Sequence, residues 1–164
     1  MNKTREKLKK IHDLCIQHNI SISTAESCTG GYISKYITDY TDSSKYYKGS
    51  IIAYSNEVKS SLLEVPDNII EKYGAVSREV SILMSKGLLK SIRADIALST
   101  TGVMEKVDGS SCKHPQVFIT IKSLHDEHTA YYKLKGNRDE NRENTVYFTF
   151  NCLYDFIHKN YLLS

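Results

Sequence analysis

The chain has 164 residues, of which 40% are hydrophobic and 25% are charged, and its formal net charge at pH 7 is +3. This length and balance predict one globular domain over residues 1–164 and exclude disordered, collagen-like and low-complexity classes. The small positive charge does not predict nucleic-acid binding, and no apolar run approaches the roughly 18 residues that a membrane-spanning helix needs.

The N-terminal residues and the cysteines indicate the compartment. The chain begins MNKTREKLKK, which is charged and has no apolar stretch after it, so it is not a secretory signal. The four cysteines are scattered and form no CxxC pair: Cys15, Cys28, Cys112 and Cys152. In a chain long enough to have its own core, this pattern is typical of reduced thiols. We therefore predict a cytoplasmic protein.

Hydrophobic periodicity predicts helices alternating with strands. The expected helices cover residues 4–18, a segment reaching about Tyr40, 56–63, a short stretch restarted by Pro66-Asp67, 77–92 and 137–159. The expected strands cover residues 20–25, 49–55 and 94–100, followed by a hairpin of 116–122 and 129–135. The first helix is amphipathic, with a basic face that we expect to be solvated. The second strand is nearly continuous in apolar character, so we expect it to be central in the sheet.

This order of elements indicates an α/β layered domain with a mixed sheet. In such sheets, ligands bind beyond the carboxyl ends of the strands. Three polar segments are expected to meet at that edge: Glu26–Gly31, Tyr54–Lys59 and Thr100–Gly102. A loop over 101–115 is longer than the usual connection, and such loops are often functional.

Ser27 is a candidate nucleophile because it lies where a strand gives way to a helix. Gly30 and Gly31 permit close backbone approach, and the N–H groups of Cys28, Thr29 or Gly30 could bind an oxyanion at the positive end of that helix. The G-x-S-x-G pattern of a nucleophile elbow is absent. The alternative is that Ser27 only caps the helix.

A serine nucleophile needs a base, and none of the three strand-end segments contains a histidine. Lys59 lies one helical turn into the segment after the second strand. A lysine can act as a base when burial or a nearby cation lowers its pKa. Tyr54 could relay a proton or donate to a substrate. The alternatives are a surface lysine and a tyrosine of the core or rim.

Four motifs together resemble the CinA C-terminal domain family, the nicotinamide-nucleotide amidohydrolases that are also called competence- or damage-inducible proteins. They are TAESCTGG at 24–31, AYSNEVK at 53–59, YGAVS at 73–77, and ADIA at 94–97 with Thr101-Gly102. The resemblance extends from about residue 5 to residue 158. It implies a three-layer α/β/α sandwich with a mixed, mostly parallel sheet. It also implies conversion of nicotinamide mononucleotide to nicotinate mononucleotide and ammonia in pyridine nucleotide salvage.

The resemblance also implies roles for individual residues. Ser27 corresponds to the nucleophile and Lys59 to its general base. Tyr54 and Thr101 correspond to supporting residues, and the positive helix end comprises Cys28, Thr29, Gly30 and Gly31. The implied substrate-binding residues are Asn56, Gly102, Arg138 and Arg142, of which the two arginines are candidates for the phosphate. The resemblance implies no cofactor and no metal. The expected partners are a small pyridine nucleotide and further copies of the chain, which would form a dimer or larger oligomer. No nucleic acid or membrane is expected as a partner. We expect the separate N-terminal domain of longer members to be absent here, so its metal-dependent pyrophosphatase activity is not implied.

The sequence departs from the family pattern after Thr101-Gly102. The family has a Gly-Pro turn and a glycine-rich loop there, whereas this chain reads VMEKVDGSS at 103–111, with Pro115 near the place of a family glycine. Glu105 and Asp108 would repel a phosphate, and Lys106 would only partly offset them. We therefore keep a second hypothesis, a weak or catalytically silent nucleotide-binding or regulatory protein.

Two further alternatives stay open. Cys28 could be the nucleophile, because a helix N-terminus favours a thiolate. His125 and His128, together with Cys112 and His114, could form a metal site, although their spacing is sparse and the histidines lie in a hairpin turn rather than on a helix.

Overall fold

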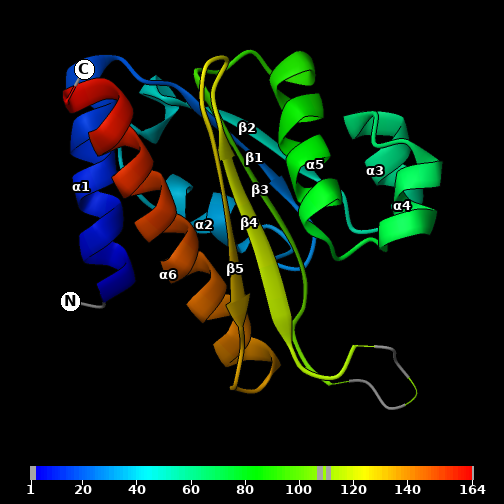
Figure 1. Ribbon diagram of the computed structural model, residues 1–164. Helices are drawn as coiled ribbons and strands as arrows, with labels where there is room; N and C mark the ends of the chain where they lie inside the picture. The colour runs from blue at the N-terminus through cyan, green and yellow to red at the C-terminus, as the bar shows by residue number, and fades with distance from the viewer. Residues whose placement is uncertain (1–2, 107–108, 110–111, 164) are drawn as a thin grey trace.

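A five-stranded mixed sheet forms the centre of the computed structural model, which describes residues 3–106, 109 and 112–163. In sheet order the strands are β2 (Tyr47–Ile52), β1 (Ile22–Glu26), β3 (Ile96–Val103), β4 (Gln116–Lys122) and β5 (Glu127–Lys133). β1 pairs in parallel with both β2 and β3, while β4 is antiparallel to β3 and to β5. Among the described strands, β4 alone runs against the others (Figure 1).

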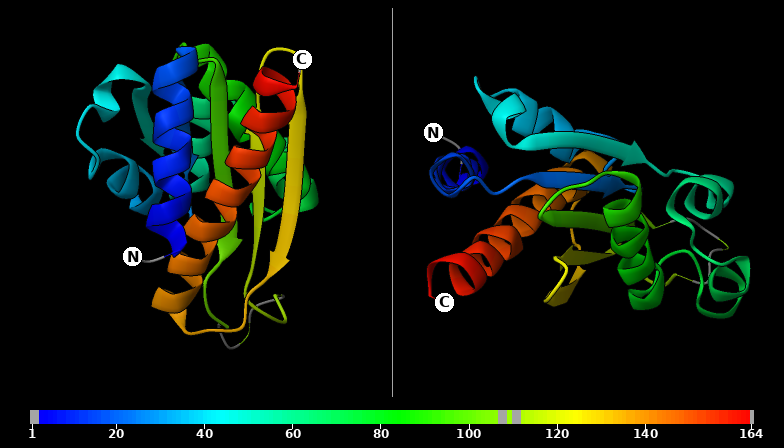
Figure 2. Two further views of the ribbon diagram at one scale, coloured as in Figure 1. Left: turned by 90° about the vertical axis from the view of Figure 1, so that its left-hand side faces the viewer. Right: turned by 90° about the horizontal axis from the view of Figure 1, so that it is seen from above.

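Helices cover both faces of this sheet, which confirms the three-layer α/β/α architecture (Figures 1 and 2). One face carries α1 (Lys3–His18), α2 (Tyr32–Thr38) and α6 (Arg138–Ile157). The other carries α3 (Asn56–Leu63), α4 (Asp67–Tyr73) and α5 (Arg78–Ser91). A 3-10 turn (Ser43–Lys45) precedes β2, and a π-helical turn (His158–Leu162) follows α6.

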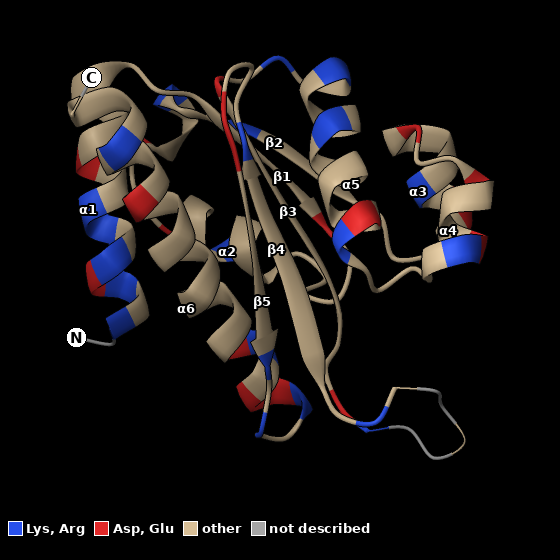
Figure 3. Ribbon diagram, viewed as in Figure 1, with Lys and Arg blue, Asp and Glu red and all other residues tan. Residues whose placement is uncertain are grey.

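Each face of the sheet has its own apolar core. Under α1, α2 and α6, the buried side chains include Leu8, Ile11 and Phe150. Under α3, α4 and α5, they include Leu63, Val80, Met84 and Leu88. The polar side of α1 faces solvent and carries its lysines and arginine, as its periodicity predicts (Figure 3). None of the described helices is long and apolar enough to cross a membrane.

The close approach of α3 and α5 depends on Gly87. A Cβ atom at this position would lie 1.8 Å from the carbonyl oxygen of Leu63, the last residue of α3. The backbone of α5 therefore contacts the backbone of α3 directly, and this contact places α3 beside the edge of the sheet where β1, β2 and β3 end.

The structure corrects two expectations about the elements. β2 is an edge strand rather than a central one, and Ile52 is 49% exposed. β3 continues through Val103, so Thr101 and Gly102 belong to a strand and the following loop is shorter. α2 begins at Tyr32, directly after Gly31, as its pattern predicts.

Candidate active site

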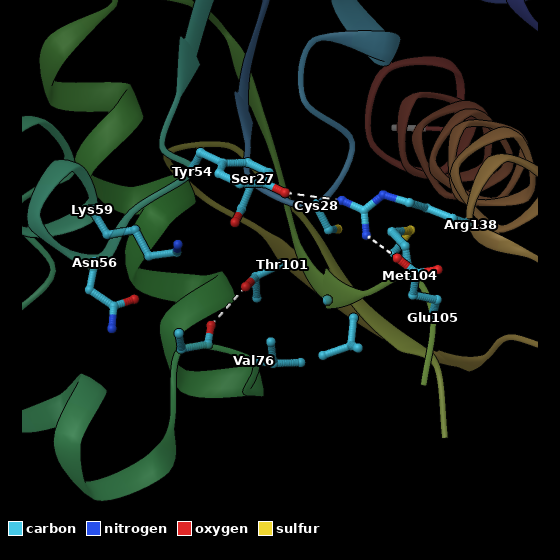
Figure 4. Close-up of a pocket in the computed structure, with 13 residues that line it drawn as sticks. Ser27, Cys28, Tyr54, Asn56, Lys59, Val76, Thr101, Met104, Glu105 and Arg138 are labelled. Atoms are coloured by element: carbon cyan, nitrogen blue, oxygen red, sulfur yellow. Dashed lines mark hydrogen bonds and ion pairs between the residues drawn. The ribbon is translucent and has the colours of Figure 1, made fainter. Parts of the chain in front are cut away.

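The carboxyl ends of β1, β2 and β3 meet at one edge of the sheet, as parallel neighbours must. A cavity of about 250 Å³ lies there. It is lined by Ser27 and Cys28 after β1, by Tyr54, Asn56 and Lys59 after β2, by Ala75 and Val76 before α5, by 101–105 at the end of β3, and by Arg138 at the start of α6 (Figure 4). The predicted convergence of the three strand-end segments is confirmed.

Backbone hydrogen bonds fix Ser27 at the carboxyl end of β1. Its N–H donates to the carbonyl of Thr100 at 3.1 Å, and its own carbonyl accepts from the Gly30 N–H at 3.1 Å. The side chain is 8% exposed, and its hydroxyl points into the cavity (Figure 4). The N-cap of α2 is Gly31, whose φ is 97°. The alternative that Ser27 caps this helix is therefore wrong, and its hydroxyl faces the space where a substrate would lie.

The positive end of α2 is occupied by the side chain of Glu26, a residue for which the sequence predicts no role of its own. Its carboxylate is 1% exposed and accepts hydrogen bonds from the N–H groups of Gly31, Ile33 and Ser34 at 3.0, 3.1 and 2.8 Å. The hydroxyls of Thr29 and Ser34 donate to the same carboxylate. A buried carboxylate therefore neutralises this helix end and fixes the turn that follows Ser27.

These bonds limit the oxyanion donors. The Gly31 N–H donates to Glu26 and the Gly30 N–H donates to Ser27, so neither is free to hold an oxyanion, contrary to the expectation. The N–H groups of Cys28 and Thr29 remain as candidates. The position of Glu26 at the end of a buried strand could have indicated this role, because a buried carboxylate needs several hydrogen-bond donors.

Lys59 is buried beside the same cavity. α3 starts with Ser55 as its N-cap, whose hydroxyl accepts from the Val58 N–H, and this places Lys59 in the first turns. The side chain is 2% exposed, and its Nζ donates to the Ala53 carbonyl at 3.0 Å. Burial lowers the pKa of the Lys59 amine, and the nearby Cys28 opposes this only in part. The surface-lysine alternative is therefore wrong.

The Lys59 amine and the Ser27 hydroxyl both point into the cavity (Figure 4). No hydrogen bond joins them among the contacts of residues 3–106. Apo active sites often hold such pairs beyond hydrogen-bond distance until a substrate is bound. The arrangement has the parts of a serine nucleophile with a lysine base.

Tyr54, Arg138 and Glu105 form a polar chain at the rim of the cavity. Tyr54 is 63% exposed, and its hydroxyl accepts from Nη2 of Arg138 at 3.1 Å. Nη1 of Arg138 donates to the Glu105 carboxylate at 3.0 Å. Tyr54 is thus a rim tyrosine. The Arg138 guanidinium beside it is paired with Glu105, which belongs to residues 103–111, where the sequence departs from the family pattern.

Three further predicted residues line the cavity in different ways. The Thr101 hydroxyl is buried and donates to the Ala75 carbonyl at 2.7 Å, which holds the segment before α5 against β3. Gly102 has no room for a side chain, because a Cβ would lie 2.4 Å from the Gln116 carbonyl oxygen. Asn56 is exposed at the start of α3.

Arg142 has a different position from the one expected. It does not line the cavity. Its Nη2 donates to the Thr29 carbonyl at 3.1 Å, and its guanidinium carbon lies 4.0 Å from the centre of the Tyr32 ring. Arg142 therefore braces the turn after Ser27 from α6, and Arg138 is the guanidinium that faces the cavity.

The profile of the CinA C-terminal domain matches residues 4–157. The chain belongs to this family. A CinA-like protein of Dictyoglomus thermophilum is 39% identical over 150 residues, which are 92% of this chain and 36% of that protein. A putative competence-damage inducible protein of Halothermothrix orenii is 41% identical over 151 residues, 90% of this chain and 36% of that protein. The chain thus spans about a third of the length of these relatives.

Solved structures of the family share the fold. The competence/damage inducible protein CihA from Agrobacterium tumefaciens is 28% identical, with a TM-score of 0.84 over 94% of this chain and 96% of that one. A CinA superfamily protein from Klebsiella pneumoniae is 25% identical, with a TM-score of 0.88 over 94% of this chain and 97% of that one.

In this CinA domain, Cys28 is a poor nucleophile. Its side chain is 7% exposed, and burial raises the pKa of its thiol to about 12. At neutral pH the group is therefore a thiol, and the favourable effect of a helix N-terminus does not apply because Glu26 occupies that end.

The four candidate metal ligands do not form one site. His125 lies in the turn of the β4–β5 hairpin and His128 is the second residue of β5, whereas Cys112 and His114 lie at the opposite end of the hairpin, beyond the pairing of Gln116 with Lys133. No group of three or more His, Cys, Asp or Glu side chains is arranged to hold a metal in the described parts of the chain. Asp108, the other acid expected to repel phosphate, lies outside the described residues.

Proposed function

We propose that this CinA domain is an amidohydrolase that hydrolyses the carboxamide of a nicotinamide nucleotide, with nicotinamide mononucleotide as the substrate that the family resemblance implies. The observation that carries the proposal is the buried Lys59 amine, with its lowered pKa, in the cavity that the Ser27 hydroxyl faces. A reactive serine needs such a base, and a lysine can serve only when it is uncharged.

The first half of the reaction forms an acyl-enzyme. Neutral Lys59 removes the Ser27 hydroxyl proton while the Ser27 oxygen attacks the carboxamide carbon. The N–H groups of Cys28 and Thr29 are the candidate donors to the oxyanion, and one such donor typically contributes ~3–4 kcal/mol. Lys59 then returns the proton to the leaving nitrogen, the C–N bond breaks, and ammonia departs.

The second half releases the acid. Water loses a proton to Lys59 and attacks the ester carbonyl, and the Ser27 oxygen leaves with that proton as nicotinate is freed. General base catalysis of this kind typically contributes ~10²–10⁴-fold. Arg138 and Tyr54, at the rim, are the groups that would contact the ribosyl phosphate end of the substrate.

The test is ammonia release from nicotinamide mononucleotide by the wild-type chain and by Ser27→Ala and Lys59→Ala. We expect each substitution to reduce kcat by roughly 10³-fold or more. The matched controls are Ser61→Ala and Lys72→Ala, which change exposed side chains outside the cavity and should keep wild-type rates. Ammonia release by Ser27→Ala at the wild-type rate would refute the proposal.

A second candidate function is binding of a nucleotide without turnover. The contacts of Lys59 favour it, because its amine donates to the Ala53 carbonyl and, among the contacts of residues 3–106, not to the Ser27 hydroxyl that it would have to deprotonate. This function predicts saturable binding with no ammonia release, and turnover that depends on Ser27 would exclude it.

A further inference from the structure

The charged side chains that line the cavity are few. Among its described lining residues they are Lys59, Glu105 and Arg138. The proposed reaction needs Lys59 to be neutral, and Arg138 is paired with Glu105 at 3.0 Å. The catalytic state of the cavity therefore has no net charge from these groups.

A phosphate dianion finds little compensation in this arrangement. Phosphate recognition in proteins usually rests on charge-assisted hydrogen bonds from cations or on free backbone N–H groups. The Arg142 guanidinium is bound to the Thr29 carbonyl, and the N–H groups at the start of α2 are bound to Glu26. A phosphate near Arg138 would have to displace the Glu105 carboxylate or lie beside it.

The size of the cavity favours a smaller ligand. Its volume of about 250 Å³ is below the ~300–1,000 Å³ that is common for drug-sized ligands. The Glu105–Arg138 pair is half exposed, with side chains 50% and 44% exposed, so solvent weakens it but does not remove the repulsion between a carboxylate and a phosphate.

We propose that Glu105 is a specificity-determining residue that makes this site accept the unphosphorylated nicotinamide riboside at least as well as nicotinamide mononucleotide. The proposal rests on the proposed function, whose substrate class it narrows. The carboxamide and the pyridinium ring are common to both compounds, so a comparison of the two isolates the effect of the phosphate.

The test measures binding by calorimetry in a Ser27→Ala background, where neither compound is consumed. With Glu105 present, we expect the riboside to bind with a Kd equal to or lower than that of the mononucleotide. Glu105→Gln should tighten mononucleotide binding about tenfold and change riboside binding less than about twofold. The matched control is Glu64→Gln, which removes an acid from another exposed ion pair, with Lys90, and should change neither Kd.

Three results would overturn the inference: no change in mononucleotide binding by Glu105→Gln, equal tightening of both compounds, or no saturable binding of either. Ammonia release is measured in parallel with Ser27 intact. The expected binding pattern without ammonia release from either compound would reject the proposed hydrolysis but keep the role of Glu105. If ammonia is released but Glu105→Gln leaves the ratio of the two Kd values unchanged, only the role of Glu105 would be rejected, and the proposed hydrolysis would stand.

Discussion

The Lys59 amine donates a 3.0 Å hydrogen bond to the Ala53 carbonyl, and it forms no ion pair with any acid in the described part of the chain. Because no acid compensates its burial, the charged form is disfavoured and the pKa of Lys59 falls below the usual lysine value of 10.5. A larger fraction of the Lys59 amine is therefore neutral and able to accept a proton.

The first prediction concerns the pH dependence of kcat/KM. Since the proposed mechanism needs the neutral amine, the rate should rise with pH through the folded-state pKa of Lys59, at a pH below 10.5. Lys59→Arg should abolish this activity, because arginine stays protonated throughout the range. A rate that is flat with pH and survives Lys59→Arg would contradict the assignment.

The second prediction concerns stability. The pKa of Lys59 is lower in the folded than in the unfolded chain, so between the two values the unfolded chain binds more protons and stability rises with pH. Lys59→Met keeps the length of the side chain and removes the buried amine. It should raise the free energy of unfolding at neutral pH by ~0.5–2 kcal/mol while eliminating turnover.

Urea unfolding of both proteins at about pH 7 and about pH 10 checks this prediction. The difference between wild type and Lys59→Met should shrink at the higher pH. A variant that is less stable at both pH values would show that the amine contributes more through its Ala53 hydrogen bond than its burial costs.

The third prediction separates the two neighbouring side chains, Ser27 and Cys28. Burial raises the pKa of the Cys28 thiol to about 12, so iodoacetamide should alkylate it slowly at neutral pH. Cys28→Ala should keep ammonia release within about tenfold of wild type, whereas Ser27→Ala should lose roughly 10³-fold or more. Loss of activity in Cys28→Ala with retention in Ser27→Ala would identify the thiol as the nucleophile.

The fourth prediction concerns the carboxylate at the start of α2. Glu26→Gln replaces one acceptor oxygen with an NH₂ group that faces N–H and O–H donors. We expect a loss of about 2–3 kcal/mol in the free energy of unfolding and a lower kcat, because the turn after Ser27 loosens. The control is Glu71→Gln on the exposed side of α4, and equal unfolding midpoints for the two variants would contradict the role of Glu26.

The fifth prediction concerns the contact between α3 and α5. Gly87→Ala places a methyl group against the Leu63 carbonyl, so the helices must separate. We expect a loss of ~1–3 kcal/mol in stability and reduced ammonia release, because α3 carries Lys59. Lys86→Ala, on the exposed side of the same helix, is the control for both measurements.

The sequence predicts the parts of this site that depend on local order. Ser27, Lys59 and Thr101 follow or end parallel strands, and parallel neighbours necessarily bring those ends to one sheet edge. The inward stripe of the last helix, Val146 and Phe150 included, follows from its 3.6-residue period.

The features that the sequence does not predict depend on partners far along the chain. The apolar run of β2 does not reveal that, among the described strands, only β1 pairs with it, since an edge strand can also cover an apolar core. The bonds of Glu26 are a local exception: their N–H donors lie 5 to 8 residues ahead, and the bonds depend on how the turn after Ser27 folds. The direction of Arg142 depends on the Thr29 carbonyl, 113 positions away. For the same reason, the pairing of Arg138 with Glu105 is visible only in three dimensions.

The hydrogen bond from Arg142 to the Thr29 carbonyl spans 113 positions of the chain. The candidate nucleophile lies in the first fifth of the sequence, yet the turn beside it is braced by the last long helix. During translation, the ribosome therefore delivers Ser27 long before the residue that steadies its surroundings. We expect a nascent chain that stops short of α6 to lack the proposed amidohydrolase activity, so that a truncated translation product would be inert.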